Sequence, residues 1–189
     1  MSDQVSNKFE RLAVIGAGNM GSGIAQKLAT EGFDVTLVDL DDDKVARGVE
    51  IIRKTLAEGV ERKIFRQEQA DAILGRVHGT SDWSELAEID LVVEAVFENL
   101  DVKREVFKRL EAECRDDAIL GTNTSSFHVD DVASVLEHPE RVVGLHFFYH
   151  PAKNRLVEVV AGSRTTDAVV RRAWSLQEQT GKLWGSAGV

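Results

Sequence analysis

The sequence predicts a doubly wound α/β domain with a mostly parallel sheet and an antiparallel hairpin near one edge. Short apolar runs, typical of buried parallel strands, alternate with segments of helical apolar spacing along most of the chain. A glycine-rich turn joins the first apolar run to the first helical segment. Near the carboxyl end, two apolar runs are separated by seven residues, a pattern that we interpret as a hairpin.

The glycine turn is the strongest single indication of function. A strand is predicted at residues 12–15 and a helix from the turn to Glu31. Between them lies G-x-G-x-x-G, whose first glycine permits the turn, whose second lets backbone approach a pyrophosphate, and whose third lets helix and strand pack closely. The alternative is a turn that only connects two elements. We predict a dinucleotide site formed by Gly16, Gly18, Asn19, Met20 and Gly21.

The second predicted strand supports that assignment and indicates the cofactor. It covers residues 34–40 and places Asp39 at its end, eighteen residues after Gly21. An acidic side chain there accepts hydrogen bonds from the adenine-ribose hydroxyls and repels the additional phosphate of NADP. Aspartates at positions 41–43 strengthen that repulsion. NAD(H) is therefore the predicted cofactor.

A long helix with a basic second half is predicted next. It covers residues 42–66, and a helix at 67–74 and a short strand at 76–80 follow. Because the whole chain carries a net charge of −9, a local excess of cations would suit a phosphorylated substrate. The other interpretation is a solvated helix face with alternating charges, and the sequence alone favours it.

The third clear strand, at residues 90–96, is followed by two charged residues of interest. Glu98 lies just beyond its end, and Lys103 lies in the first turn of a helix predicted at 101–113. Ligands of open α/β sheets bind outside the carboxyl ends of strands, so both residues are placed to meet the cofactor or its surroundings. A helix-start carboxylate and a surface lysine explain the same positions equally well.

A run of small polar residues follows the next strand. The strand is predicted at 118–121 and leads into TNTSS at 122–126, before a helix at 128–136. Hydroxyl and amide groups at the carboxyl end of a strand can contact a ligand. The same residues also fit a turn that caps the following helix, and the two roles are compatible.

The predicted hairpin brings a histidine and a carboxylate together. Its strands are residues 141–148 and 156–161, and if its centre is Ala152, His146 lies opposite Glu158. Opposed side chains have Cβ atoms roughly 4.5–5.5 Å apart, which permits a hydrogen bond. An unpaired carboxylate in an apolar run would be costly, so Glu158 needs solvent or a partner. A carboxylate on one ring nitrogen raises the basicity of the other, as a general base requires.

Composition limits the other classes of function. With 43% hydrophobic and 29% charged residues, the chain can form a sizeable core, while its net negative charge argues against nucleic acid or an anionic membrane as the main partner. Cys114 is the only cysteine, which excludes an intrachain disulfide. We find no signal-like or membrane-spanning apolar run, predict no metal site, and expect a cytoplasmic protein whose residues 1–8 are flexible.

Taken together, six blocks of the sequence resemble one family. The blocks are GAGNMGSGIA, VDL, VVEAVFENLDVK, TNTSS, GLHFF and LVEVV. In this order and spacing they are similar to the NAD-binding domain of L-3-hydroxyacyl-CoA dehydrogenases, which include bacterial 3-hydroxybutyryl-CoA dehydrogenases. The similarity covers residues 9–182 and implies a Rossmann-type domain at 9–189. It implies reversible conversion of (S)-3-hydroxyacyl-CoA and NAD into 3-oxoacyl-CoA and NADH, in fatty acid β-oxidation or butanoate metabolism.

The resemblance also assigns catalytic roles. It implies that His146 removes the proton of the 3-hydroxyl group while hydride leaves C3 for the nicotinamide. It implies that Glu158 orients His146 and stabilises its charged form, and that Ser125 contacts substrate and cofactor.

Binding roles follow from the same resemblance. Glu98 and Lys103 match cofactor-side residues of the family. Thr55 and Arg62 fall where the family contacts coenzyme A, a looser match that rests on helix position and agrees with the basic half of the helix.

Two features depart from the family pattern. The usual HFFNP becomes HFFYHP, so Tyr149 replaces an asparagine that contacts the nicotinamide end. The chain also ends at Val189, before the helical domain that supplies another active-site asparagine and the dimer interface in the family. We expect this chain to bind NAD(H) but to turn over acyl-CoA poorly or not at all, and the full-length protein to be a homodimer.

Two other functions remain open from the sequence. One is a dehydrogenase for a hydroxy acid or sugar acid without coenzyme A, of the L-gulonate type. The other is a non-catalytic NAD(H)-binding module, which the missing helical domain favours and the retention of His146 and Glu158 opposes.

Overall fold

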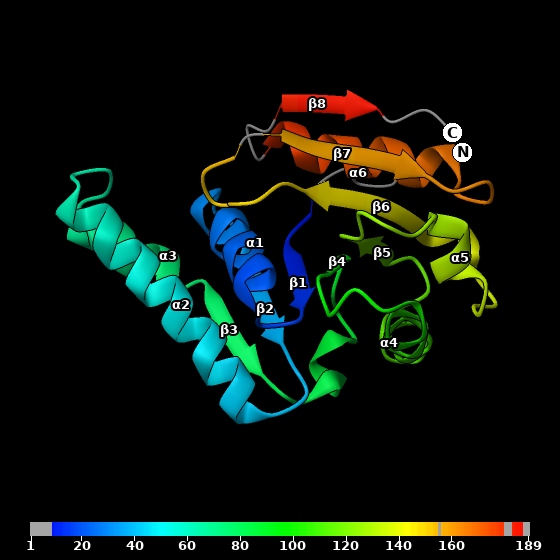
Figure 1. Cartoon of the computed structure of the whole chain (residues 1–189), viewed down its shortest axis with the longest axis horizontal. Coiled ribbons are helices and arrows are strands. Elements are labelled where there is room, and N and C mark those ends of the chain that lie inside the picture. The colour runs from blue at the N-terminus through cyan, green and yellow to red at the C-terminus, as the bar shows by residue number, and fades with distance from the viewer. Residues whose placement is uncertain (1–8, 155, 180–182, 187–189) are drawn as a thin grey trace, which may run out of the picture.

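The computed structural model of the protein describes residues 9–154, 156–179 and 183–186, so the predicted flexible segment 1–8 lies outside it. One sheet of eight strands runs through the described residues in the order β3-β2-β1-β4-β5-β6-β7-β8 (Figure 1). The strands are β1 (Arg11–Ile15), β2 (Asp34–Val38), β3 (Val77–Thr80), β4 (Leu91–Glu94), β5 (Ile119–Thr122), β6 (Val142–Phe147), β7 (Leu156–Ala161) and β8 (Leu183–Ser186).

The directions of the strands confirm the predicted fold class. Strands β1 to β6 are mutually parallel, whereas β7 pairs with β6 in the antiparallel direction and β8 pairs with β7 in parallel. The antiparallel hairpin therefore lies near one edge of a mostly parallel sheet, as the apolar runs predict. Helix α6 and strand β8 extend that edge and are not predicted by the sequence pattern.

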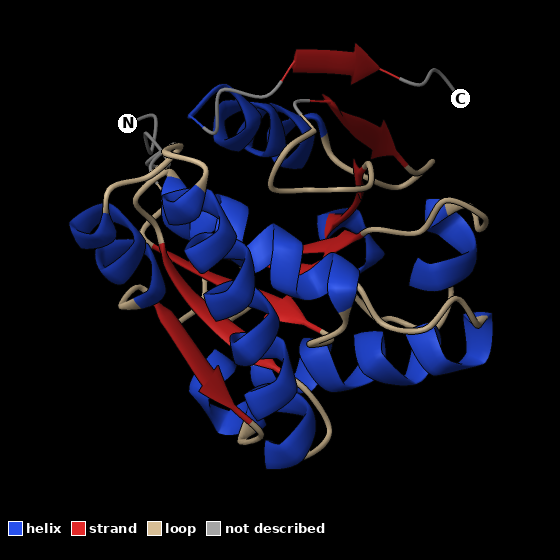
Figure 2. Cartoon of the chain, turned by 60° about the vertical axis from the view of Figure 1, so that its left-hand side comes forward, coloured by secondary structure: helices blue, strands red, loops and turns tan. Residues whose placement is uncertain are grey.

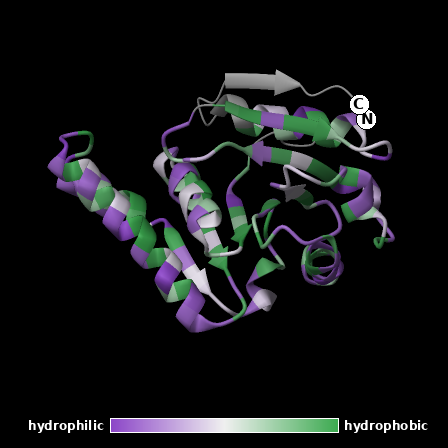
Figure 3. Ribbon diagram, in the orientation of Figure 1, coloured by the Kyte–Doolittle hydropathy of each residue, from purple (hydrophilic) through white to green (hydrophobic). Residues whose placement is uncertain are grey.

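Helices cover both faces of this sheet (Figure 2). Alternate residues of β1 point to opposite faces: Leu12 and Val14 pack with α1, α2, α3 and α6, whereas Ala13 and Ile15 pack with α4 and α5. The central strands β1, β4 and β5 are accordingly apolar except at their ends, and polar residues lie on the outer helix faces (Figure 3). The helices are α1 (Asn19–Thr30), α2 (Asp42–Glu61), α3 (Gln67–Leu74), α4 (Leu100–Glu113), α5 (Val129–Ala133) and α6 (Asp167–Gln179), with short 3-10 helices η1 (Trp83–Leu86) and η2 (Pro139–Arg141).

The predicted helix 42–66 is too long, because α2 ends at Glu61. Lys63 adopts a left-handed conformation with φ of 59°, and the backbone N–H of Ile64 turns back to donate to Gly59 at 2.8 Å. The ring of Phe65 then packs against Gly59, where a Cβ would lie 2.6 Å from it. The basic residues after Glu61 consequently lie in a turn and not on a helix face.

None of the helices in the described part of the chain combines the length and the apolar character needed to cross a membrane. The same described residues contain no cluster of histidine, cysteine and carboxylate side chains suited to a metal ion.

Candidate active site

The glycine turn is shaped by two close backbone approaches. Gly16 has φ of +103°, and a Cβ there would lie 2.7 Å from the carbonyl oxygen of Ala95 on the neighbouring strand segment. A Cβ on Gly21 would lie 1.7 Å from the carbonyl oxygen of Gly16. Gly18 differs, because a Cβ there would meet nothing within 4 Å and the residue is exposed at the start of α1. That open space, beside the first N–H groups of α1, suits a diphosphate.

We predict that alanine at these positions separates folding from cofactor binding. Gly21→Ala should lower the free energy of unfolding by about 3 kcal/mol, because the methyl group overlaps backbone. Gly18→Ala should leave stability unchanged but weaken NADH binding about tenfold, because it fills the space for the diphosphate. Urea denaturation and NADH fluorescence titration would measure the two effects. Equal NADH affinity of Gly18→Ala and the unsubstituted chain would show that the diphosphate does not bind here.

Asp39 lies beside the glycine turn, just beyond the end of β2. Its Oδ2 accepts a hydrogen bond from the N–H of Ala17 at 2.7 Å, and its Oδ1 accepts one from the N–H of Leu40 at 2.7 Å. The half-buried carboxylate is thereby held next to the loop that would bind the diphosphate. Its selection of NAD(H) over NADP(H) stays a prediction.

Behind the turn, a buried ion pair joins β4 to α4. Glu94 is 0% exposed and Lys103 is 1% exposed, and the Lys103 Nζ donates to the Glu94 Oε1 at 2.8 Å. The same oxygen accepts the N–H of Val96 at 2.7 Å, while Oε2 accepts the Thr122 hydroxyl of β5 at 2.7 Å. Lys103 is therefore a buried residue, and its ammonium group is held by the Glu94 carboxylate, which is itself fixed by Val96 and Thr122.

Glu98 completes this network on its open side. It lies 3.1 Å from the Lys103 Nζ and accepts a hydrogen bond from the Thr124 hydroxyl. Burial raises the pKa of Glu98, but the hydrogen bonds from Thr124 and Lys103 outweigh burial and hold the pKa below its ordinary value. Glu98 is therefore charged at neutral pH, and two carboxylates surround one ammonium group.

We predict that the buried carboxylate is important for stability. Glu94→Gln should lower the free energy of unfolding by about 3 kcal/mol, because a nearly inaccessible ammonium group loses a charged partner. Glu50→Gln is a matched control: Glu50 pairs with Arg53 on the surface at 2.5 Å, and this change should cost less than about 1 kcal/mol. Urea denaturation of both variants would test this, and similar losses for the two would contradict it.

The predicted pairing of His146 with Glu158 is confirmed. The two residues are directly opposed across β6 and β7, and His146 Nδ1 lies 2.8 Å from Glu158 Oε2. Because a carboxylate can only accept, Nδ1 carries the proton and Nε2 is left free. The Phe148 ring lies 4.4 Å from the imidazole, centroid to centroid. The His146 side chain keeps 20% exposure, which suits a group that meets a ligand.

One cavity brings several predicted residues together. It is lined by Met20 of α1, Glu98 and Lys103 after β4, Ser125 after β5, and His146 of β6. These residues are far apart in the sequence and meet because β1, β4, β5 and β6 all end at the same edge of the sheet. Their catalytic and cofactor-binding roles stay predictions, but their predicted proximity is observed.

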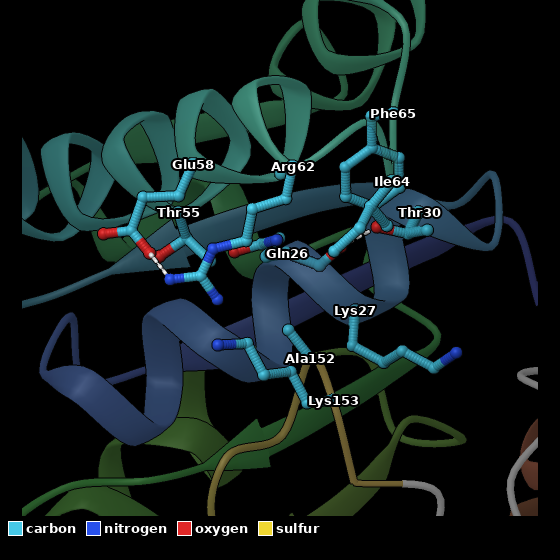
Figure 4. A pocket seen from close by; sticks show the side chains of 11 residues that line it. Gln26, Lys27, Thr30, Thr55, Glu58, Arg62, Ile64, Phe65, Ala152 and Lys153 are labelled. Carbon is cyan, nitrogen blue, oxygen red and sulfur yellow. Dashed lines mark hydrogen bonds and ion pairs between the residues drawn. The ribbon is translucent and has the colours of Figure 1, made fainter.

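Thr55 and Arg62 line a second cavity, between α1, the end of α2 and the β6–β7 loop (Figure 4). The Thr55 hydroxyl donates to the carbonyl of Ile51 at 2.9 Å, and Arg62 lies 4.0 Å from Glu58. The sequence analysis places Arg62 inside a helix, but α2 ends at Glu61 and Arg62 is the C-cap residue that follows it. The structure nevertheless brings the two predicted residues into one cavity.

Comparison with known proteins identifies the family. A family described as 3-hydroxyacyl-CoA dehydrogenase, NAD binding domain, matches residues 11–184. The chain belongs to this family. Its cofactor is therefore NAD, in agreement with the glycine turn and Asp39.

Relatives with established names share the domain but are longer. The chain is 35% identical over 173 residues to 3-hydroxybutyryl-CoA dehydrogenase of Clostridioides difficile, covering 92% of this chain and 62% of that protein. It is 37% identical to the fatty acid oxidation complex subunit alpha of a Psychrobacter species, covering 94% of this chain and 25% of the relative. The crystal structure of 3-hydroxybutyryl-CoA dehydrogenase from Escherichia coli K12 matches with 38% identity and a TM-score of 0.90, over 95% of this chain and 38% of that one. The chain thus spans less than two thirds of these family members.

The sequence analysis does not identify two residues that shape this site. Glu94 is read only as an interruption of an apolar strand, although the argument that a buried carboxylate needs a partner applies to it as it does to Glu158. Asn123 accepts the backbone N–H of Phe147 at 2.7 Å through its Oδ1, and so ties the end of β5 to β6 beside His146. The run TNTSS indicates polar chemistry there but not this contact.

Proposed function

We propose that this chain provides the NAD site and the proton-transfer pair of an enzyme that interconverts (S)-3-hydroxyacyl-CoA and 3-oxoacyl-CoA. The observation that supports this most directly is the 2.8 Å contact of His146 with Glu158, because His146 also lines a cavity with Glu98, Lys103 and Ser125. Membership of the 3-hydroxyacyl-CoA dehydrogenase family agrees with it. A domain that only senses NAD would not need an oriented base.

The residues fit the cofactor. Gly18 leaves open space where a side chain would block a diphosphate, and Asp39 lies beside that space. When bound, NAD supplies an acceptor for the hydride that leaves C3 of the hydroxyacyl group. The Glu98 carboxylate, charged at neutral pH, faces the cavity in which the cationic ring would lie.

His146 supplies the acid–base chemistry. Its free Nε2 accepts the proton of the 3-hydroxyl group as the C3–H bond breaks, so a secondary alcohol becomes a ketone with loss of one proton and one hydride. Glu158 accepts the Nδ1 proton and stabilises the imidazolium that forms. Ser125, at the rim of the same cavity, would hold the substrate oxygen near Nε2.

The second cavity supplies the recognition of coenzyme A in this proposal. Thr55 and Arg62 line it, and its cations stand out in a chain with a net charge of −9. A cationic site for a phosphorylated tail favours an acyl-CoA over a small sugar acid as the substrate. We also propose that the enzyme is cytoplasmic and acts as a homodimer.

The proposal can be tested by single-turnover kinetics. The chain in excess, mixed with NADH and acetoacetyl-CoA, should oxidise NADH slowly, and His146→Gln should be slower by about 10²–10⁴-fold because the positioned acid is lost. His138→Gln is the matched control, since His138 also contacts a glutamate, Glu140 at 3.2 Å, but on the exposed surface. It should have no effect.

Two outcomes of this experiment would contradict the proposal: equal rates for His146→Gln and the unsubstituted chain, and no NADH oxidation even though NADH is bound. A second assay, in the direction of NAD reduction, would contradict it if L-gulonate were oxidised faster than 3-hydroxybutyryl-CoA.

A further inference from the structure

The loop between β6 and β7 contributes to both cavities. Tyr149 at its start lines the cavity of His146, and Ala152 and Lys153 near its end line the cavity of Thr55 and Arg62. Figure 4 shows Arg62 reaching into the second cavity from the end of α2, where it is the C-cap residue, and Lys153 reaching into it from the loop on the opposite side. Two cations from different elements therefore face the same space.

The charges of this cavity are unevenly balanced. Lys27 also lines it, but its ammonium group pairs with Glu31 and points away from Arg62 and Lys153 (Figure 4). Arg62 has only a distant contact with Glu58, at 4.0 Å. Lys153 makes no ion pair with any carboxylate in the part of the chain that the structure describes. The cavity can therefore accept an anion between Arg62 and Lys153.

Backbone contacts hold Lys153 in place. The N–H groups of Lys153 and Asn154 both donate to the carbonyl of His150, at 2.9 and 2.8 Å. Pro151 is buried against α1, where a Cβ on Gly23 would lie 3.1 Å from its ring. Burial, and then the charge of Lys153, lower the pKa of His150, so of these two residues Lys153 is the one that is charged at neutral pH.

We propose that Lys153 binds a phosphate group of the coenzyme A tail, opposite Arg62, and thereby makes the enzyme select thioesters of coenzyme A over thioesters without phosphate. This inference rests on the proposed function. Tyr149 and Lys153 are four positions apart in the sequence, so their Cα atoms are at most roughly 14 Å apart. An acyl-pantetheine arm can span that distance, with its phosphates at Lys153 and its acyl group at His146.

The loop also gives this binding a consequence for catalysis. Because one short anchored segment forms part of both cavities, a phosphate held at Lys153 fixes the segment that begins with Tyr149. Binding energy from a remote part of the substrate is then used to position the reacting group.

The test compares ligands with and without phosphate. Dissociation constants of acetoacetyl-CoA and of S-acetoacetyl-pantetheine, which has no phosphate, would be measured by calorimetry for the unsubstituted chain and for Lys153→Gln. Lys153→Gln should weaken acetoacetyl-CoA about tenfold, the loss of one charge-assisted hydrogen bond, and leave the pantetheine thioester unchanged. Lys54→Gln is the control, because Lys54 lies on α2 with its side chain 73% exposed and outside the cavity; it should change neither constant.

The outcomes separate the inference from the function on which it rests. If the unsubstituted chain prefers acetoacetyl-CoA to the pantetheine thioester but Lys153→Gln retains that full preference, the role of Lys153 is overturned and the proposed function stands. If Lys54→Gln weakened acetoacetyl-CoA binding as much as Lys153→Gln does, the effect would be general charge attraction, and the specific role of Lys153 would also be overturned. If the unsubstituted chain binds NADH but neither thioester, the proposed acyl-CoA function fails. Circular dichroism melting curves would confirm that all variants are folded.

Discussion

The contact between His146 and Glu158 depends on a single reversal of chain direction. Strands β1 to β6 run in parallel, so the carboxyl ends of β1, β4, β5 and β6 meet at one edge of the sheet, next to the glycine turn. Strand β7 then runs back, which places a carboxylate near its start opposite a histidine near the end of β6. One edge of the sheet thus has both a nucleotide-binding turn and an oriented imidazole.

Charged groups at this edge are stabilised by mutual contacts. Glu94, Lys103, Thr122 and Glu98 form a continuous network from the buried ends of β4 and β5 to the open cavity. Desolvation of such groups is costly unless each one is paired, and here each has a partner at hydrogen-bonding distance. The same network fixes the start of α4 and the segment after β5, and these place Glu98 and Ser125. Stability and site geometry therefore depend on the same contacts.

Local patterns in the sequence predict much of this arrangement. The glycine turn, the order of strands and helices, and the opposition of His146 to Glu158 follow from spacing, because a hairpin of known centre has a defined register. Contacts between elements that are far apart in the sequence are harder to predict. The end of α2 depends on Phe65 folding back onto Gly59, and the partner of Glu94 lies on another element, so neither can be read from periodicity. A role for Lys153 cannot be predicted from the sequence, because only the structure shows that its loop lies opposite the end of α2.

The imidazole tautomer is the property on which proton transfer depends. In neutral histidine in water the proton favours Nε2, whereas a base that receives the substrate proton on Nε2 needs its own proton on Nδ1. Nitrogen-15 NMR of the His146 ring, in the neutral form, measures this directly. We predict that Nδ1 carries the proton, held by Glu158, and that Nε2 shows the shift of an unprotonated nitrogen. A neutral ring protonated on Nε2 would contradict the assignment of His146 as the oriented base.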